Sequence, residues 1–393
     1  MRCNGPTADA AQRSEAGPRR DPLTTQGIGS RRHVLTAISG PRCGTLPRIR
    51  AVKVLVTGGT GFTGSHTAAA LMAAGHDVRL MVRDPAKVRR VFDPLGLVPT
   101  DVVTADMVDH AAVEDALAGC DGVIHTAALV DLRRASASLV ENTNTRGAEV
   151  VIGAAADRGV TRIVHVSSLT VFFRPGGPPM TTTMPIVDGS TAYARSKARA
   201  ERYVRRLQDS GAGIRISYPA GIVGPHDPGP SAVNAGLASF LHDTFLITTG
   251  GLQIVDVRDL ARLHVTLLEL PPGPDRYVAA SEMLTWPQIY ELCCRLTGTR
   301  PRKVTVPGFL LRAAGTVGDI AKRLHDFDFP LTRDAMEVGT RWPGADTERT
   351  TRELGVRFRD PADTLRDTLR WMYSAGHLSA AEVGKLAAEA VPS

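Results

Sequence analysis

The feature that most constrains the fold is an apolar run that leads directly into a glycine-rich turn and then into a helix-forming stretch. Val52–Val56 is short and apolar, and residues 57–64 read TGGTGFTG. Phe62–Ala74 is rich in Ala and ends at Gly75, which favours a helix that stops there. A strand, a tight turn and a helix in this order indicate the first unit of a parallel α/β sheet.

The glycines of the turn have the spacing expected where a backbone approaches phosphate groups. Gly58 permits the tight turn, Gly61 lets the main chain approach a pyrophosphate, and Gly64 allows close packing of helix and strand. The start of the helix, with Phe62 and Thr63, adds free N–H groups and a partial positive charge. We therefore predict a dinucleotide site at these five residues.

Short apolar runs and Ala-rich stretches alternate from Val52 to about Tyr218, which predicts a doubly wound, parallel, Rossmann-like α/β sheet. The predicted strands are Val52–Val56, Val78–Val82, Val102–Thr104, Val123–Thr126, Arg162–Ser167 and Ile214–Ser217. The predicted domains are a disordered basic arm (1–50), a dinucleotide-binding domain (51–220), a smaller substrate lobe partly interleaved with the sheet domain (221–374), and a loosely held or disordered tail (375–393).

The positive charge is concentrated in the arm. The chain has 393 residues and a net charge of +7, and residues 1–50 hold nine Arg and three acids, which leaves +1 for residues 51–393. We therefore expect no nucleic-acid surface on the fold. For the arm itself, a nucleic-acid-binding tail, a transit peptide and a natural start near Val52 are alternatives to simple disorder.

The remaining composition points to a cytoplasmic protein without metal. The five Cys residues have irregular spacing, which favours free thiols in a reducing cytoplasm over disulfides, and no metal-ligand motif occurs. Vicinal Cys293 and Cys294 are interpreted as small apolar residues of a helix, with a redox pair as the alternative. No apolar run is long enough to predict a membrane-spanning helix.

The end of the second strand indicates the cofactor. Binders of NAD usually place an acid there for the ribose 2′-hydroxyl, whereas Arg83 follows Val78–Val82 directly, with Arg79 and Lys87 nearby. A guanidinium matches a phosphate in charge and geometry, so NADP is favoured and NAD is the alternative. Asp84 is the competing residue, since it could reach the ribose or cap the next helix.

Two later strand ends add candidate cofactor contacts. Asp106 and Met107 follow the third strand, where Asp106 would accept from the adenine amino group or cap a turn. Ala127 and Ala128 follow the fourth strand and are small enough for a nicotinamide ribose to lie close. His125 is interpreted as a core histidine rather than an acid/base.

The catalytic candidates are Tyr193, Lys197 and Ser168. Tyr193 and Lys197 are four residues apart at the start of a predicted helix, so they share one face. An ammonium and a cationic nicotinamide ring are expected to lower the phenol pKa from about 10 into a useful range for general acid/base work. Lys197 would also hold the ribose hydroxyls. Ser168 follows the fifth strand and would bond the substrate oxygen, with Ser167 and Thr170 as competitors.

A family resemblance is carried in chain order by TGGTGFTG, ADMVD, VIHTAA, NTRGAEVV, IVHVSS, YARSK and YPAGIVGP. The chain resembles the extended short-chain dehydrogenase/reductase family, also called the NAD-dependent epimerase/dehydratase family, from about Val52 to Tyr373. HDVRLMVRDPAK is most similar to its dihydroflavonol reductase and 3β-hydroxysteroid dehydrogenase branches.

This resemblance implies the roles proposed above for the Ser, Tyr and Lys. It also implies that Asn144 is the Asn of the fourth helix, that Pro219 and Ile222 line the nicotinamide, and that a homodimer forms through the fourth and fifth helices. Val171-Phe172-Phe173 stands where the family often has Val-Tyr-Gly, and Tyr218 stands where many members have Arg. Together with the following loop, Arg174–Asp188, which is rich in Pro, Gly and Thr, these departures suggest an apolar substrate.

The function expected from the sequence is an NADP-dependent carbonyl reductase or alcohol dehydrogenase that acts on a small apolar molecule. A nucleotide-sugar epimerase or dehydratase is the first alternative, and a cofactor-binding sensor or scaffold without turnover is the second.

Overall fold

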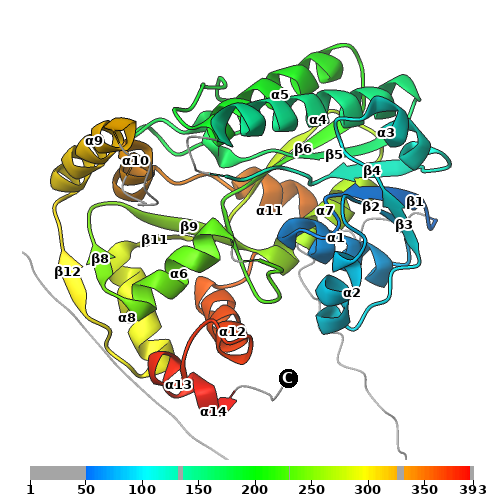
Figure 1. The fold of residues 1–393 in the computed structure, drawn as a ribbon. Helices are drawn as coiled ribbons and strands as arrows, with labels where there is room; N and C mark the ends of the chain where they lie inside the picture. Colours follow the sequence, from blue (N-terminus) through cyan, green and yellow to red (C-terminus); the bar gives the residue numbers. More distant parts are fainter. Residues whose placement is uncertain (1–49, 132–135, 230, 325–331, 390–393) are drawn as a thin grey trace, which may run out of the picture. The chain divides into compact units, whose positions relative to one another are not determined.

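A seven-stranded parallel sheet forms the centre of the fold, with strand order β10-β6-β5-β4-β1-β2-β3 (Figure 1). The computed structural model describes residues 50–131, 136–229, 231–324 and 332–389, so the predicted arm lies almost wholly outside it. The strands are β1 (Lys53–Thr57), β2 (Asp77–Val82), β3 (Asp101–Thr104), β4 (Gly122–His125), β5 (Arg162–Val166), β6 (Ile214–Pro219) and β10 (Arg276–Ala279). The doubly wound sheet predicted from the sequence is confirmed.

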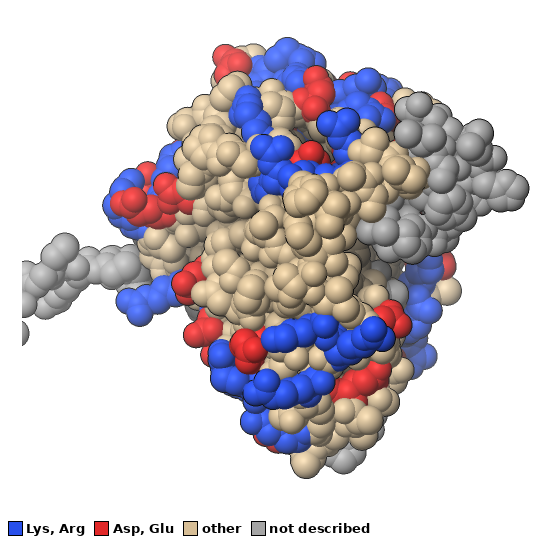
Figure 2. Space-filling view, turned by 90° about the vertical axis from the view of Figure 1, so that its left-hand side faces the viewer, with Lys and Arg blue, Asp and Glu red and all other residues tan. Residues whose placement is uncertain are grey.

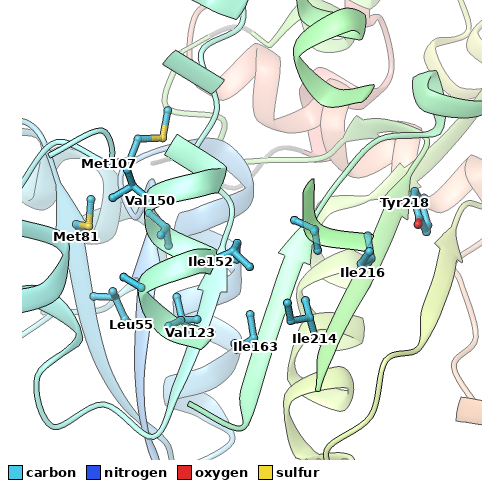
Figure 3. Packing of buried hydrophobic residues seen from close by; sticks show 14 of the residues in the cluster. Leu55, Met81, Met107, Val123, Val150, Ile152, Ile163, Ile214, Ile216 and Tyr218 are labelled. Atoms are coloured by element: carbon cyan, nitrogen blue, oxygen red, sulfur yellow. The ribbon is translucent and has the colours of Figure 1, made fainter. Parts of the chain in front are cut away.

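Helices cover both faces of this sheet, which explains why its strands are almost continuously apolar. α3 (His110–Leu117), α4 (Ala137–Asp157) and α5 (Ala192–Asp209) cover one face, and α1 (Phe62–Ala73) and α7 (Val257–Glu269) cover the other. Figure 3 shows the first of these two cores, where Val150 and Ile152 of α4 pack over Val123 and Ile163 of the sheet.

The direction of winding reverses between β1 and β4. The chain proceeds outward from β1 to β2 and β3, then crosses to β4 on the other side of β1, so that Thr57 and His125 are register partners. Ligands of open α/β sheets bind in the crevice at such a switch point, at the carboxyl ends of the strands. The glycine-rich turn follows β1 and therefore lies in this crevice.

The chain beyond β6 builds a third core and also returns to the sheet. Its apolar cluster is formed by β7 (Gly221–Val223), α6 (Ala232–His242), β8 (Phe245–Ile247), β9 (Gly251–Asp256), α8 (Trp286–Thr297) and α12 (Pro361–Ser374). Cys293 and Cys294 are buried in α8, as the apolar interpretation predicted. Because α7 and β10 pack on the central sheet, the domain boundary near residue 220 stays a prediction.

The described part of the C-terminal tail, up to Glu389, is packed, so the expectation of a loosely held segment is wrong there. α13 (Ala380–Val383) and α14 (Leu386–Glu389) follow α12, and Leu378, Val383 and Leu386 are buried in the third core. These three apolar side chains account for the difference, since they bury enough surface to order a short Ala-rich segment. No helix in the described ranges has both the length and the apolarity needed to cross a membrane.

Candidate active site

The turn after β1 is shaped so that its glycines are required. Gly58 has a φ of +68°, and a Cβ there would lie 2.8 Å from the Cα of Ala127. A Cβ on Gly64 would lie 2.1 Å from the carbonyl oxygen of Gly58. Gly61 precedes α1 and provides no side-chain cap, so the first N–H groups of α1 are available to a ligand. This cradle fits the pyrophosphate of a dinucleotide.

The end of β4 is tied to this turn. The Thr126 hydroxyl donates to the carbonyl oxygen of Thr57 at 2.6 Å, and the backbone N–H of Ala127 donates to the Thr57 hydroxyl at 3.3 Å. Ala127 is half-buried beside Gly58, and Ala128 is exposed beyond it. The sequence analysis did not single out Thr126, although a hydroxyl that follows a buried strand is a signal for such a tie.

His125 is a core histidine, as the sequence analysis preferred. Its Nδ1 is 2.8 Å from the Thr57 hydroxyl, and its ring stacks on that of His165 with centroids 5.6 Å apart. Burial lowers the pKa of His125 to about 3, so the ring is neutral at physiological pH. His125 therefore belongs to the buried core and does not line the site.

Arg83 lies exposed at the end of β2, and among the described residues its side chain forms no ion pair or hydrogen bond. Asp84 instead turns to its own chain, where Oδ1 accepts from the N–H of Ala86 at 3.0 Å and Oδ2 is 3.7 Å from Nζ of Lys87. Arg79 is committed to Asp101, with Nε 3.0 Å from Oδ1. Arg83 is thus the cation that remains available at this strand end.

The other predicted cofactor residues lie at several strand ends. Asp106 makes the turn that was one of its two alternatives, with Oδ1 accepting from the N–H of Val108 at 3.1 Å. Met107 is buried against Gly147 of α4. Pro219 is buried at the end of β6, and Ile222 of β7 is half-buried. Their contacts with a cofactor stay predictions.

Tyr193, Lys197 and Ser168 meet at the carboxyl end of β5. The Thr191 side chain caps α5 by accepting from the N–H of Ala194 at 3.1 Å, which places Tyr193 in the first turn of the helix. Nζ of Lys197 lies 5.9 Å from the centroid of the Tyr193 ring. The Ser168 side chain is hydrogen-bonded to the Tyr193 phenol.

The protonation of this trio differs from the expectation. Burial raises the pKa of Tyr193, and the hydrogen bond with Ser168 opposes that rise. Nζ of Lys197 donates to the carbonyl oxygen of Val166 at 2.9 Å and not to the phenol, so the protein's own groups do not produce the expected lowering. The lowering expected from a cationic nicotinamide stays a prediction. Burial also lowers the pKa of Lys197 to about 8, and the charge of Glu201 acts against this.

Glu201 is a residue that sequence analysis missed. It is fully buried on α5, and one carboxylate oxygen accepts from the Tyr218 hydroxyl and from Nε of Arg205, the latter at 2.8 Å. The signal was present, since Tyr193, Lys197, Glu201 and Arg205 follow one another at intervals of four residues along one face of α5.

Tyr218 corrects an inference from the sequence. Its side chain is fully buried, with its ring centroid 4.9 Å from that of Phe172. Phe172 is itself buried, and Tyr218 donates to a carboxylate inside the core, so neither residue can contact a substrate. These two departures from the family pattern therefore say nothing about the polarity of the substrate.

Asn144 connects the strand ends to the helix that carries Tyr193. Its Nδ2 donates to the carbonyl oxygen of Leu129 at 2.9 Å and to the hydroxyl of Ser196 at 3.0 Å. Ser196 donates in turn to the carbonyl oxygen of Tyr193 at 2.7 Å. This chain of hydrogen bonds fixes α5 relative to the segment that follows β4.

Comparison with known proteins agrees with this geometry. Residues 54–280 match the model of the NAD dependent epimerase/dehydratase family. Sterol demethylase protein B of Methylococcus capsulatus is 29% identical over 332 residues, which cover 82% of this chain and 98% of that protein. A putative dihydroflavonol 4-reductase of Synechocystis is 26% identical, over 82% of this chain and 95% of that protein.

Solved structures show the same fold. The crystal structure of gox2253 superposes with a TM-score of 0.72 at 25% identity, over 84% of this chain and all of that one. A UDP-glucose-4-epimerase from Stenotrophomonas maltophila, solved with bound NAD, gives 0.67 at 23% identity and covers 84% of this chain and 100% of that one. With the glycine cradle at the switch point and a family match over more than half of its length, the chain belongs to the NAD dependent epimerase/dehydratase family.

Proposed function

We propose that the protein is an NADP-dependent reductase of an apolar carbonyl compound, or the corresponding alcohol dehydrogenase. The observation that carries this proposal is that Tyr193, Ser168 and Lys197 meet at the carboxyl end of β5. The glycine cradle follows the carboxyl end of β1, a parallel strand of the same sheet. A phenol with a hydroxyl partner and an amine is suited to exchange a proton with a substrate oxygen.

The hydrogen bonds around Ser168 indicate how the site handles a carbonyl oxygen. Thr170 donates to Oγ of Ser168 from its N–H at 3.3 Å and from its hydroxyl at 3.0 Å. In both of these bonds Oγ of Ser168 is the acceptor. The hydroxyl proton of Ser168 can therefore be donated to the phenol or to the substrate oxygen. Tyr193 gives its hydroxyl proton to that oxygen, and NADPH, held by the glycine cradle and Arg83, would supply the hydride to the carbon.

Arg83 supports the choice of NADP. Its guanidinium is unpaired within the described chain, whereas the carboxylate next to it, Asp84, already accepts from the turn of Ala86. A cation without a partner at the end of β2 suits a 2′-phosphate, and an acid occupied elsewhere is a poor partner for a 2′-hydroxyl.

The relatives support an apolar substrate. Their names refer to a sterol, a dihydroflavonol and, for an Arabidopsis thaliana protein 26% identical over 83% of this chain, cinnamoyl-CoA. We also propose that the protein forms a homodimer through α4 and α5.

The test is a cofactor titration followed by a carbonyl panel. Purified protein is titrated with NADPH and NADH, and sterol ketones, flavonoids and aromatic aldehydes are then scored by the loss of reduced-nicotinamide absorbance. The proposal expects tighter NADPH binding and consumption with an apolar carbonyl. Tightly retained cofactor with no net change in absorbance, while a nucleotide sugar is converted, would support an epimerase instead.

A further inference from the structure

α9 (Gly308–Leu324) presents an apolar face to the outside. Phe309 is 63% exposed, Leu310 49% and Val317 66%, and Ala313 and Ala314 between them are exposed as well. These five residues, here called the α9 apolar face, recur at the three- and four-residue spacing of one helix side. Val304 and Val338 are exposed nearby.

The inward side of α9 is the less apolar one. Gly315 packs against the backbone of Arg333 in α10 (Arg333–Arg341), and Nη1 of Arg312 donates to the Thr340 hydroxyl at 3.0 Å. A helix at the surface of a globular protein normally turns its apolar stripe inward and its polar residues outward. The reversed arrangement of α9 calls for an apolar partner outside the chain.

The segment that leads into α9 is basic. Residues 300–312 contain four Lys or Arg and no Asp or Glu, and Arg300, Arg302 and Lys303 are exposed immediately before α9. Figure 2 shows this side of the molecule, where Lys and Arg side chains gather above and below a central uncharged field. The charge of residues 300–312 complements an anionic surface.

α9 is also connected, through α10, to the segment that precedes the helix of Tyr193. α10 packs against α9 and contacts the segment between Phe173 and Tyr193, because Gly176 donates to the carbonyl oxygen of Arg341 at 2.9 Å and Ser190 bonds Asp334. Figure 1 shows α9 and α10 beside the loop that leads into α5.

We propose that the α9 apolar face and the basic residues before it dock the protein on an anionic lipid bilayer. Apolar side chains at the headgroup boundary and cations beside them are the two components of such binding. An acidic protein partner would not need five adjacent apolar residues, and a second copy would bring equal positive charges together at the same face. The inference does not depend on the reaction proposed above.

The experiment is co-sedimentation of the full chain with phosphatidylcholine vesicles, with and without phosphatidylglycerol. Phe309→Ser/Val317→Ser removes the two most exposed large apolar side chains of the face, and Val98→Ser is the control because this residue is 84% exposed elsewhere. Wild type and control are expected to bind anionic vesicles, and the α9 variant to bind about tenfold less or weaker still. Arg300→Gln/Arg302→Gln should lose about fivefold for each charge.

The basic arm is present in all of these proteins, so a difference between them belongs to the α9 side. Equal binding by wild type and the α9 variant would overturn the proposal. So would a wild type that ignores vesicles but dimerises in light-scattering measurements while the α9 variant is monomeric, since the partner would then be a second copy.

Discussion

Replacing Gly64 by Ala should damage both the fold and the cofactor site, in contrast to the same change in another helix. The added Cβ would lie 2.1 Å from the oxygen of Gly58 and 2.8 Å from its carbonyl carbon, so rigid backbone has to move. Overpacking of this kind costs about 1–3 kcal/mol, against a gain of up to about 1 kcal/mol from the better helix propensity of Ala. We expect Gly64→Ala to lower the free energy of unfolding by about 1–2 kcal/mol.

Gly236 of α6 provides the matched control, because nothing lies within 4 Å of a Cβ built there. Gly236→Ala should therefore leave the stability unchanged or raise it by up to about 1 kcal/mol. Urea denaturation measures both variants, and fluorescence titration measures NADPH binding, which should weaken about tenfold in Gly64→Ala only. If Gly64→Ala matched Gly236→Ala in both assays, the close packing of α1 on the turn would be refuted.

Two further predictions concern the cofactor and the pH dependence. Arg83→Ala should weaken NADPH binding about tenfold or more and leave NADH binding nearly unchanged. The control is Arg90→Ala, which removes an exposed arginine of the next helix and should alter the binding of neither cofactor. Equal losses of affinity for both cofactors would contradict the NADP assignment. Lys197, whose pKa is lowered to about 8, should lose its proton as the pH rises above that value, so reduction declines there. Glu201→Gln removes a charge that raises this pKa and should move the decline to lower pH; an unchanged profile would show that Lys197 does not govern it. The pKa of Lys197 is lower in the folded protein than in the unfolded chain. The free energy of unfolding should therefore rise between about pH 8 and about pH 10.4, because the buried amine loses its charge in that range.

The central sheet was predictable because its strands are buried on both faces. β1 was expected at Val52–Val56 and lies at Lys53–Thr57, and similarly small shifts apply to the other five expected strands. β10 (Arg276–Ala279) was not predicted, since a four-residue strand with a charged first residue gives almost no signal by itself. Only its parallel pairing with β6 makes it a strand.

The site was predictable where spacing alone places a side chain. Tyr193 and Lys197 share a face because α5 is a helix, and the cradle follows from three glycines after a strand. Burial could not be predicted in the same way. Tyr218 was interpreted as a departure that suggests an apolar substrate but lies in the core with Glu201, and burial raises the pKa of Tyr193.

The most direct test of the account is the turnover of Tyr193→Phe with NADPH and the best carbonyl substrate. The account predicts unchanged NADPH affinity and a turnover lower by about a hundredfold to ten-thousandfold, because the proton donor is lost and the fold is kept. Tyr203→Phe, on the same helix but with its hydroxyl bonded to the carbonyl oxygen of Glu149, should keep wild-type turnover. Wild-type turnover by Tyr193→Phe would contradict the proposed proton transfer.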